Sequence, residues 1–84
     1  MKLDIRTKAL IAIGASITAN CQPCLQHHVS HAIENGVNEQ DIAEAIAMGQ
    51  MIRKGAAGKM DTFAANACSS MPVASRADAG ACCG

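Results

Sequence analysis

Apolar residues recur at intervals of three and four along most of this 84-residue chain, and no segment alternates apolar with polar residues. An interval of three or four returns to the same face of an α-helix, whereas a strand needs an interval of two. The pattern therefore predicts an all-α protein. We expect about four helices, over residues 3–20, 21–35, 39–54 and 59–67.

Residues typical of helix ends separate the expected helices. Asn20 is a good N-cap for the second helix, and Pro23 falls in its first turn, where a missing N–H costs little. Gly36 is typical of the position just after a helix, and Asn38 is a second N-cap. Residues 55–58, Gly-Ala-Ala-Gly, predict a corner between the third and fourth helices.

Each of the first three expected helices has an apolar face. The faces are formed by Leu3, Leu10, Ile13 and Ile17, by Leu25, Val29, Ala32 and Ile33, and by Ile42, Ala45, Ile46, Gly49 and Ile52. The third face is wide, which indicates burial between neighbouring helices. Gly49 lies within it, and because glycine has no side chain we expect another helix to approach closely there.

The composition limits how this chain can be stable and what it can bind. Half of its residues are hydrophobic, yet it has one phenylalanine and no tryptophan or tyrosine. A chain of this size buries only about two thirds of its unfolded surface, so we expect an obligate homo-oligomer. A formal net charge of zero and scarce aromatic residues argue against a nucleic-acid partner. No apolar run approaches the roughly 20 residues that span a membrane.

The chain divides into a predicted helical domain, residues 1–68, and a tail, residues 69–84. The tail is small and polar, which predicts flexibility, and it carries Cys82 and Cys83. The total of five cysteines is odd, and a closely spaced pair in a helical chain suits a reducing compartment. Because Asp4 and several polar residues interrupt the N-terminal apolar stretch, we expect no signal peptide and a cytoplasmic protein.

A Cys-x-x-Cys motif, Cys21-Gln22-Pro23-Cys24, lies where the second helix is expected to begin. Two thiols at this spacing can close a small disulfide, and the free N–H groups of a helix N-terminus stabilise thiolates. His28 follows Cys24 by four residues and therefore lies on the same helical face. The motif indicates thiol redox chemistry.

Three other interpretations of these residues remain open. Cys21, Cys24 and His28 could supply three ligands to a soft metal or metalloid ion, with His31 or a tail cysteine as the fourth. The cysteine pair could also be inert, and the histidines could be surface residues. Cys82 and Cys83 could act as auxiliary thiols that bind a thiophilic ion or relay electrons, or could be incidental.

Around this motif the chain resembles the carboxymuconolactone decarboxylase and alkylhydroperoxidase D family. The similarity covers roughly residues 5–66 and is carried by residues 8–13, 20–28 and 32–45. The resemblance implies an all-helical fold that assembles into trimers, hexamers or larger rings. It also implies reduction of hydroperoxides or disulfides by a dithiol, without a cofactor, at the expense of a dithiol or protein electron donor. The decarboxylase branch of the family lacks the dithiol.

The resemblance assigns a role to each residue of the motif. Cys24 matches the cysteine that reacts with peroxide, Cys21 the cysteine that resolves its sulfenic acid, and His28 the histidine of a proton relay. One position differs, because Ala9 stands where the family usually has a relay glutamate. Dithiol exchange needs no glutamate, so we expect a thiol–disulfide oxidoreductase, with hydroperoxide reduction as the further activity that the resemblance implies.

Overall fold

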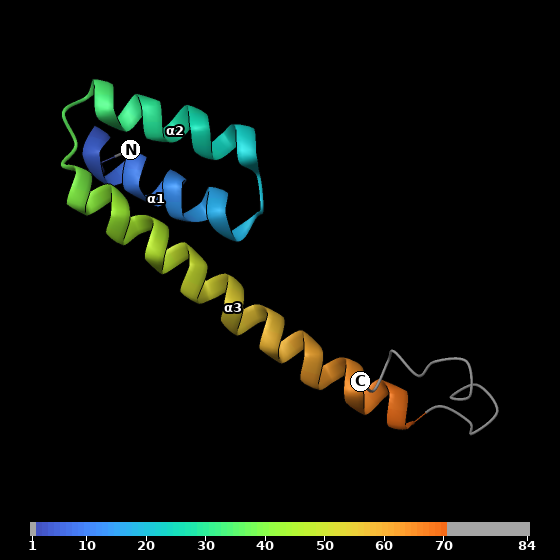
Figure 1. Ribbon diagram of the computed structural model, residues 1–84. Coiled ribbons are helices and arrows are strands. Elements are labelled where there is room, and N and C mark those ends of the chain that lie inside the picture. The colour runs from blue at the N-terminus through green and yellow to red at the C-terminus, as the bar shows by residue number, and fades with distance from the viewer. Residues whose placement is uncertain (1, 71–84) are drawn as a thin grey trace. The chain divides into compact units, whose positions relative to one another are not determined.

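The structure is a computed structural model that describes residues 2–70, and every regular element within that range is a helix. In chain order these are α1 (Ile5–Thr18), α2 (Gln22–Glu34) and α3 (Glu39–Ser69), shown in Figure 1. The prediction of an all-α protein is confirmed. The chain divides into two compact units, residues 1–54 and 55–84, so α1, α2 and the first half of α3 form one unit.

The predicted corner at residues 55–58 is wrong, because α3 runs through it as one helix of 31 residues. The described part of the chain therefore has three helices where four were expected. Ala56 and Ala57 are the strongest helix formers, and each flanking glycine costs a helix only about 1 kcal/mol. That cost is too small to end a helix by itself, and no proline follows the two glycines before α3 ends. The boundary between the two compact units nevertheless falls after Lys54.

The connection from α1 to α2 differs from the prediction in its cap. Asn20 has φ 57°, a left-handed conformation that asparagine tolerates better than most residues, so it ends α1 and does not cap α2. The N-cap of α2 is Cys21. The Asn20 side chain instead accepts a hydrogen bond from Arg53 of α3, with 3.0 Å between Nη1 and Oδ1. Pro23 lies in the first turn of α2, as predicted.

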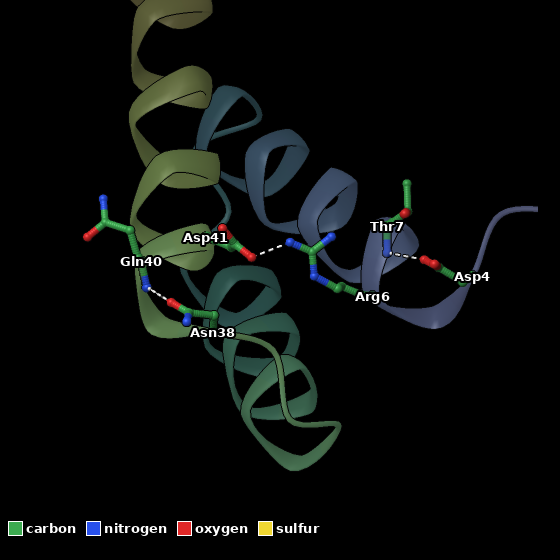
Figure 2. A network of polar contacts seen from close by, with 6 residues as sticks. All are labelled: Asp4, Arg6, Thr7, Asn38, Gln40 and Asp41. Atoms are coloured by element: carbon green, nitrogen blue, oxygen red, sulfur yellow. Dashed lines mark hydrogen bonds and ion pairs between the residues drawn. The ribbon is translucent and has the colours of Figure 1, made fainter.

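The connection from α2 to α3 is the one that the sequence predicts. Gly36 has φ 75°, which glycine adopts without strain. Asn38 accepts a hydrogen bond from the Gln40 N–H at 2.7 Å, so its role as N-cap is confirmed (Figure 2). Asp41 in the first turn of α3 forms an ion pair with Arg6 of α1, and this pair links the beginnings of the two helices.

The core of the first unit lies where α1, α2 and the start of α3 meet. Its buried members are Ala9, Ile13, Ala32, Val37 and Ile42. Three of these were expected from the helical faces. Leu3, Ile33 and Ile52 were also expected to be buried, but they are 49%, 57% and 55% exposed. Leu3 precedes α1 and so lies outside the helical face to which it was assigned. Ile33 is exposed although its neighbour Ala32 is fully buried, so the buried face of α2 passes through Ala32 and not Ile33.

At Gly49, α3 approaches α1 closely. A Cβ atom on Gly49 would lie 2.6 Å from the Gly14 carbonyl oxygen and 2.8 Å from the Ile17 Cβ. The Thr18 hydroxyl also donates a hydrogen bond to the Gly49 carbonyl oxygen at 3.3 Å. The predicted close helix approach at Gly49 is therefore confirmed.

Two further expectations concern membrane-spanning segments and the C-terminal tail. Within residues 2–70, no helix has both the length and the apolarity to cross a membrane. The greater part of the expected tail, with Cys82 and Cys83, lies outside the described residues. The division into a domain of residues 1–68 and a tail stays a prediction.

Candidate functional site

A disulfide joins Cys21 and Cys24 at the N-terminus of α2. The two Cα atoms are 5.3 Å apart. Cys21 is the N-cap, and its sulfur accepts a hydrogen bond from the Cys24 N–H at 3.3 Å. The first N–H groups of a helix have no partner within the helix, and the side-chain oxygen of the N-cap residue usually accepts a hydrogen bond from one of them. In α2 the Cys21 sulfur takes the place of that oxygen.

The two cysteines differ in their access to solvent. Cys24 is exposed, whereas Cys21 is half-buried and lines a pocket of about 250 Å³ beside Leu25 and Arg53. Of the two residues, Cys24 is therefore the more exposed to solvent. Arg53 places a guanidinium in the pocket, and it donates to Asn20 Oδ1 at 3.0 Å.

His27, His28 and His31 lie together on α2, three, four and seven residues beyond Cys24. The His27 ring is 5.0 Å from the His28 ring and 6.4 Å from the His31 ring, measured between centroids. The rings of His27 and His31 are nearly parallel. His27 is exposed and the other two are half-buried.

The histidines face α1 across a pocket of about 370 Å³, called here the histidine pocket. Its lining consists of Ile5, Lys8, Ala9 and Ala12 from α1 and His27, His28 and His31 from α2. Neither Cys21 nor Cys24 belongs to this lining. The structure thus gathers the histidines with Lys8 and Ala9, while the disulfide lies at the start of α2.

The comparison with known families decides what kind of chain this is. The model of the carboxymuconolactone decarboxylase family matches residues 1–67. The chain belongs to this family. The matched range includes the disulfide, the histidines and Ala9, and it ends before Cys68.

One curated relative can be compared with this member of the carboxymuconolactone decarboxylase family. It is "Uncharacterized protein 4 in cox locus" of Paracoccus denitrificans, 40% identical over 55 residues. The aligned part covers 66% of this chain and 50% of the relative, so the chain spans about half the length of that protein. No solved structure matches the chain.

Ala9 stands at the position where the resemblance to the family predicts a glutamate. It is 4% exposed, faces α2 and shares the histidine pocket with His28. A side chain at residue 9 therefore points to the same space as His28. Among residues 2–70, no acidic residue lines the histidine pocket.

The metal-binding alternative named Cys21, Cys24, His28 and His31 as ligands. Among residues 2–70, no group of three or more histidine, cysteine, aspartate or glutamate side chains is arranged to hold a metal ion. The two sulfurs are bonded to each other and His31 stacks against His27. In this state of the protein the four residues do not form a ligand set. Cys82 and Cys83 lie outside the described residues.

The grouping of Lys8 and Ala9 with His27 was not foreseen from the sequence. Spacing along α2 indicates that the histidines are neighbours, but only the packing of α1 against α2 shows which residues of α1 oppose them. Cys68, in the second compact unit, is a free thiol and is 1% exposed.

Proposed function

We propose that this protein is a thiol–disulfide oxidoreductase in which Cys21 and Cys24 alternate between dithiol and disulfide. The observation that carries the proposal is their bonded arrangement at the N-terminus of α2, with Cys24 exposed. The N–H groups and dipole at a helix N-terminus stabilise a thiolate, which is the reactive form of cysteine. A pair at that position is suited to exchange, and a reducing compartment such as the cytoplasm would return it to the dithiol.

The reaction begins with the Cys24 thiolate. It attacks one sulfur of a substrate disulfide, so a Cys24–substrate bond forms, the substrate S–S bond breaks and the first substrate thiol leaves with a proton. The Cys21 thiol then loses its proton and attacks the Cys24 sulfur. This releases the second substrate thiol and closes the Cys21–Cys24 disulfide. An external dithiol donates two electrons to restore the reduced pair.

The different environments of the two cysteines support this order of roles. Cys24 is exposed and can meet a substrate, whereas the half-buried Cys21 holds its sulfur against the Cys24 N–H. His28 lies one helical turn beyond Cys24, and we assign it to proton transfer during the exchange. These assignments agree with those that the family resemblance implies.

Hydroperoxide reduction is the second activity of the same pair. The Cys24 thiolate attacks the terminal oxygen of a hydroperoxide, so an S–O bond forms and the O–O bond breaks. The terminal oxygen stays on Cys24 as a sulfenic acid, and the alkoxide fragment takes up a proton and leaves as an alcohol. The sulfenic acid then condenses with the Cys21 thiol, which closes the disulfide and releases water. Protonation of the leaving oxygen is the step in which His28 acts. Because Ala9 supplies no carboxylate to orient His28, we expect peroxide turnover to be slower than disulfide exchange.

Trapping of the mixed disulfide tests the roles of the cysteines. The Cys21→Ser variant should accumulate a covalent adduct with a small aromatic disulfide such as 5,5′-dithiobis(2-nitrobenzoate), because no second thiol resolves it. Cys24→Ser should form much less adduct at the helix N-terminus. Intact-mass measurement followed by peptide mapping locates the adduct. A Cys24→Ser variant that is labelled at Cys21 as fast as Cys21→Ser is labelled at Cys24 would reverse the assignment.

We also propose that the working form is a homo-oligomer. Among residues 2–70, nine large hydrophobic side chains are about half or more exposed, including Phe63 at 69% and Met60 at 64%. Such a surface on a small chain is typical of one that self-associates. Sedimentation should give a mass of several 8.6-kDa chains. Phe63→Glu should lower that mass and Lys59→Glu should not, whereas a wild-type monomer would contradict the proposal.

A further inference from the structure

We propose that the histidine pocket between α1 and α2 binds the carboxylate of a small organic anion. The pocket brings together four side chains that can donate hydrogen bonds to an anion, namely Lys8, His27, His28 and His31. Nothing in the proposed dithiol reaction uses Lys8, His27 or His31. These residues therefore have a role still to be assigned.

The charges around the histidine pocket favour an anion. Every titratable side chain of the lining is a lysine or a histidine. Asp4 is the N-cap of α1; its carboxylate accepts the Thr7 N–H at 2.7 Å, and it does not line the pocket. On α2, Glu34 follows His31 by three residues and is likewise outside the lining. A carboxylate would thus meet donors and a cationic ammonium group.

The size and the other walls of the histidine pocket favour an organic anion over an inorganic one. Ile5, Ala9 and Ala12 give it an apolar side formed by α1. Its volume is about 370 Å³, whereas a water molecule takes about 30 Å³. The pocket therefore has room for a carboxylate and a short alkyl chain. The carboxylate would lie among the basic side chains, and the chain would lie along the apolar side.

The position of the histidine pocket links the anion to the dithiol, and this step rests on the proposed function. His28 follows Cys24 by four residues of α2, which is about 6 Å of helix rise. In a substrate held by its carboxylate in the pocket, a chain of a few atoms between the carboxylate and the reactive bond would bring that bond to Cys24. The substrate class is then a disulfide or hydroperoxide that bears a carboxylate.

Titration of the oxidised full-length protein with hexanoate tests the binding site independently of turnover. Chemical shifts of the His27, His28 and His31 rings should move with hexanoate and stay unchanged with hexanamide. The Kd for hexanoate should be at least about tenfold lower than the Kd for hexanamide, which corresponds to one charge-assisted hydrogen bond. Equal shifts with hexanamide, or no saturable shift with either compound, would overturn the proposal.

Variants distinguish hexanoate binding in the histidine pocket from non-specific attraction by charges elsewhere on the surface. Lys8→Gln should weaken hexanoate binding by about fivefold, the upper range for an exposed ion pair, and Lys59→Gln, which removes the same charge outside the pocket, should not change it. Ala9→Glu should abolish binding by placing a resident carboxylate there. If Lys8→Gln binds hexanoate as tightly as wild type, the inference is contradicted. This test remains valid even if Ala9→Glu fails to fold.

Kinetics distinguish this inference from the proposed function. With a linear disulfide that bears a carboxylate, the KM should be lower than with its amide, and Lys8→Gln should raise the KM without changing kcat. Equal turnover of acid and amide in every variant would refute the anion site and leave the dithiol chemistry standing. Absence of any turnover, with hexanoate still bound, would refute the dithiol chemistry alone.

Discussion

Gly49 of α3 lies against Ile17 of α1 so closely that a Cβ atom on Gly49 would be 2.8 Å from the Ile17 Cβ. Real Cβ atoms do not approach another atom this closely, so the two helices can keep their separation only if residue 49 has no side chain. The same crossing brings Arg53 to the Ile17 carbonyl oxygen and to Asn20, directly before the disulfide. The contact therefore fixes α3 against the segment that leads into the candidate site.

Gly49→Ala should destabilise the protein by about 1–3 kcal/mol, the usual cost of overpacking. Alanine is the better helix former by about 1 kcal/mol, but the Gly14 carbonyl oxygen, 2.6 Å from the new Cβ, cannot move away cheaply. The measurement is urea unfolding followed by circular dichroism.

Gly58→Ala is the matched control for this variant, because a Cβ atom there meets nothing within 4 Å. It should raise the free energy of unfolding, or the helicity of α3, by the propensity gain alone. Gly49→Ala with the same stability gain as Gly58→Ala would show that the helices do not meet at Gly49.

The ion pair between Arg6 and Asp41 should contribute only about 0.2–1 kcal/mol. Arg6 is 53% exposed, so water and salt screen the interaction. A double-mutant cycle with Arg6→Gln and Asp41→Asn measures the coupling energy at low and at high salt. A coupling that persists unchanged in about 1 M salt would contradict a surface ion pair.

Asp4 should make stability depend on pH in the acidic range. Its hydrogen bonds from Thr7 hold the pKa of the carboxyl below its ordinary value of 3.8. A lowered pKa means that the folded protein binds fewer protons than the unfolded chain, so the contribution is present above pH 3.8 and is lost as the pH falls through the folded value.

The Asp4→Asn variant checks this pH dependence, since asparagine also caps helices but does not ionise. Unfolding curves of wild type and variant should differ near neutral pH and converge on acidification. A difference in stability that grows as the pH falls below 3.8 would have the opposite sign to the one expected.

The helices could be predicted from the sequence because most of their faces and ends are local properties. Ile13, Ala32 and Ile42 are buried as the spacing predicts, and Asn38 caps its helix as predicted. The corner at residues 55–58 could not be predicted correctly, since two glycines weaken a helix without ending it. The N-cap of α2 was predicted to be Asn20 and is Cys21, because Asn20 takes the left-handed conformation that ends α1.

The candidate site was predictable in its covalent part and not in its surroundings. The spacing of Cys21 and Cys24 and their position at a helix start indicated the disulfide that the structure contains. The histidine pocket depends on which face of α1 packs against α2, and that is set by the core around Ile13 and Ala32. Sequence spacing within one helix carries no such information.

Ala9→Glu should raise the rate of hydroperoxide turnover. The new carboxylate would enter the histidine pocket beside His28, where it can accept a hydrogen bond from the ring and orient it. Steady-state consumption of an uncharged alkyl hydroperoxide, which does not depend on the proposed carboxylate site, in the presence of excess dithiol measures the effect, and Ala9→Gln controls for size. An unchanged or lower rate in Ala9→Glu would remove the absent carboxylate as the explanation for slow peroxide turnover.

A count of free thiols in the reduced protein, before and after a pulse of hydroperoxide or disulfide, tests the redox role of Cys21 and Cys24 most directly. The reduced chain has five thiols, and we expect wild type to lose two of them to the Cys21–Cys24 bond. A variant that keeps only these two cysteines should lose both thiols, and in Cys24→Ser the remaining Cys21 thiol should not be lost to an internal disulfide. If Cys24→Ser loses the same number of thiols as wild type, Cys21 and Cys24 are not the redox pair.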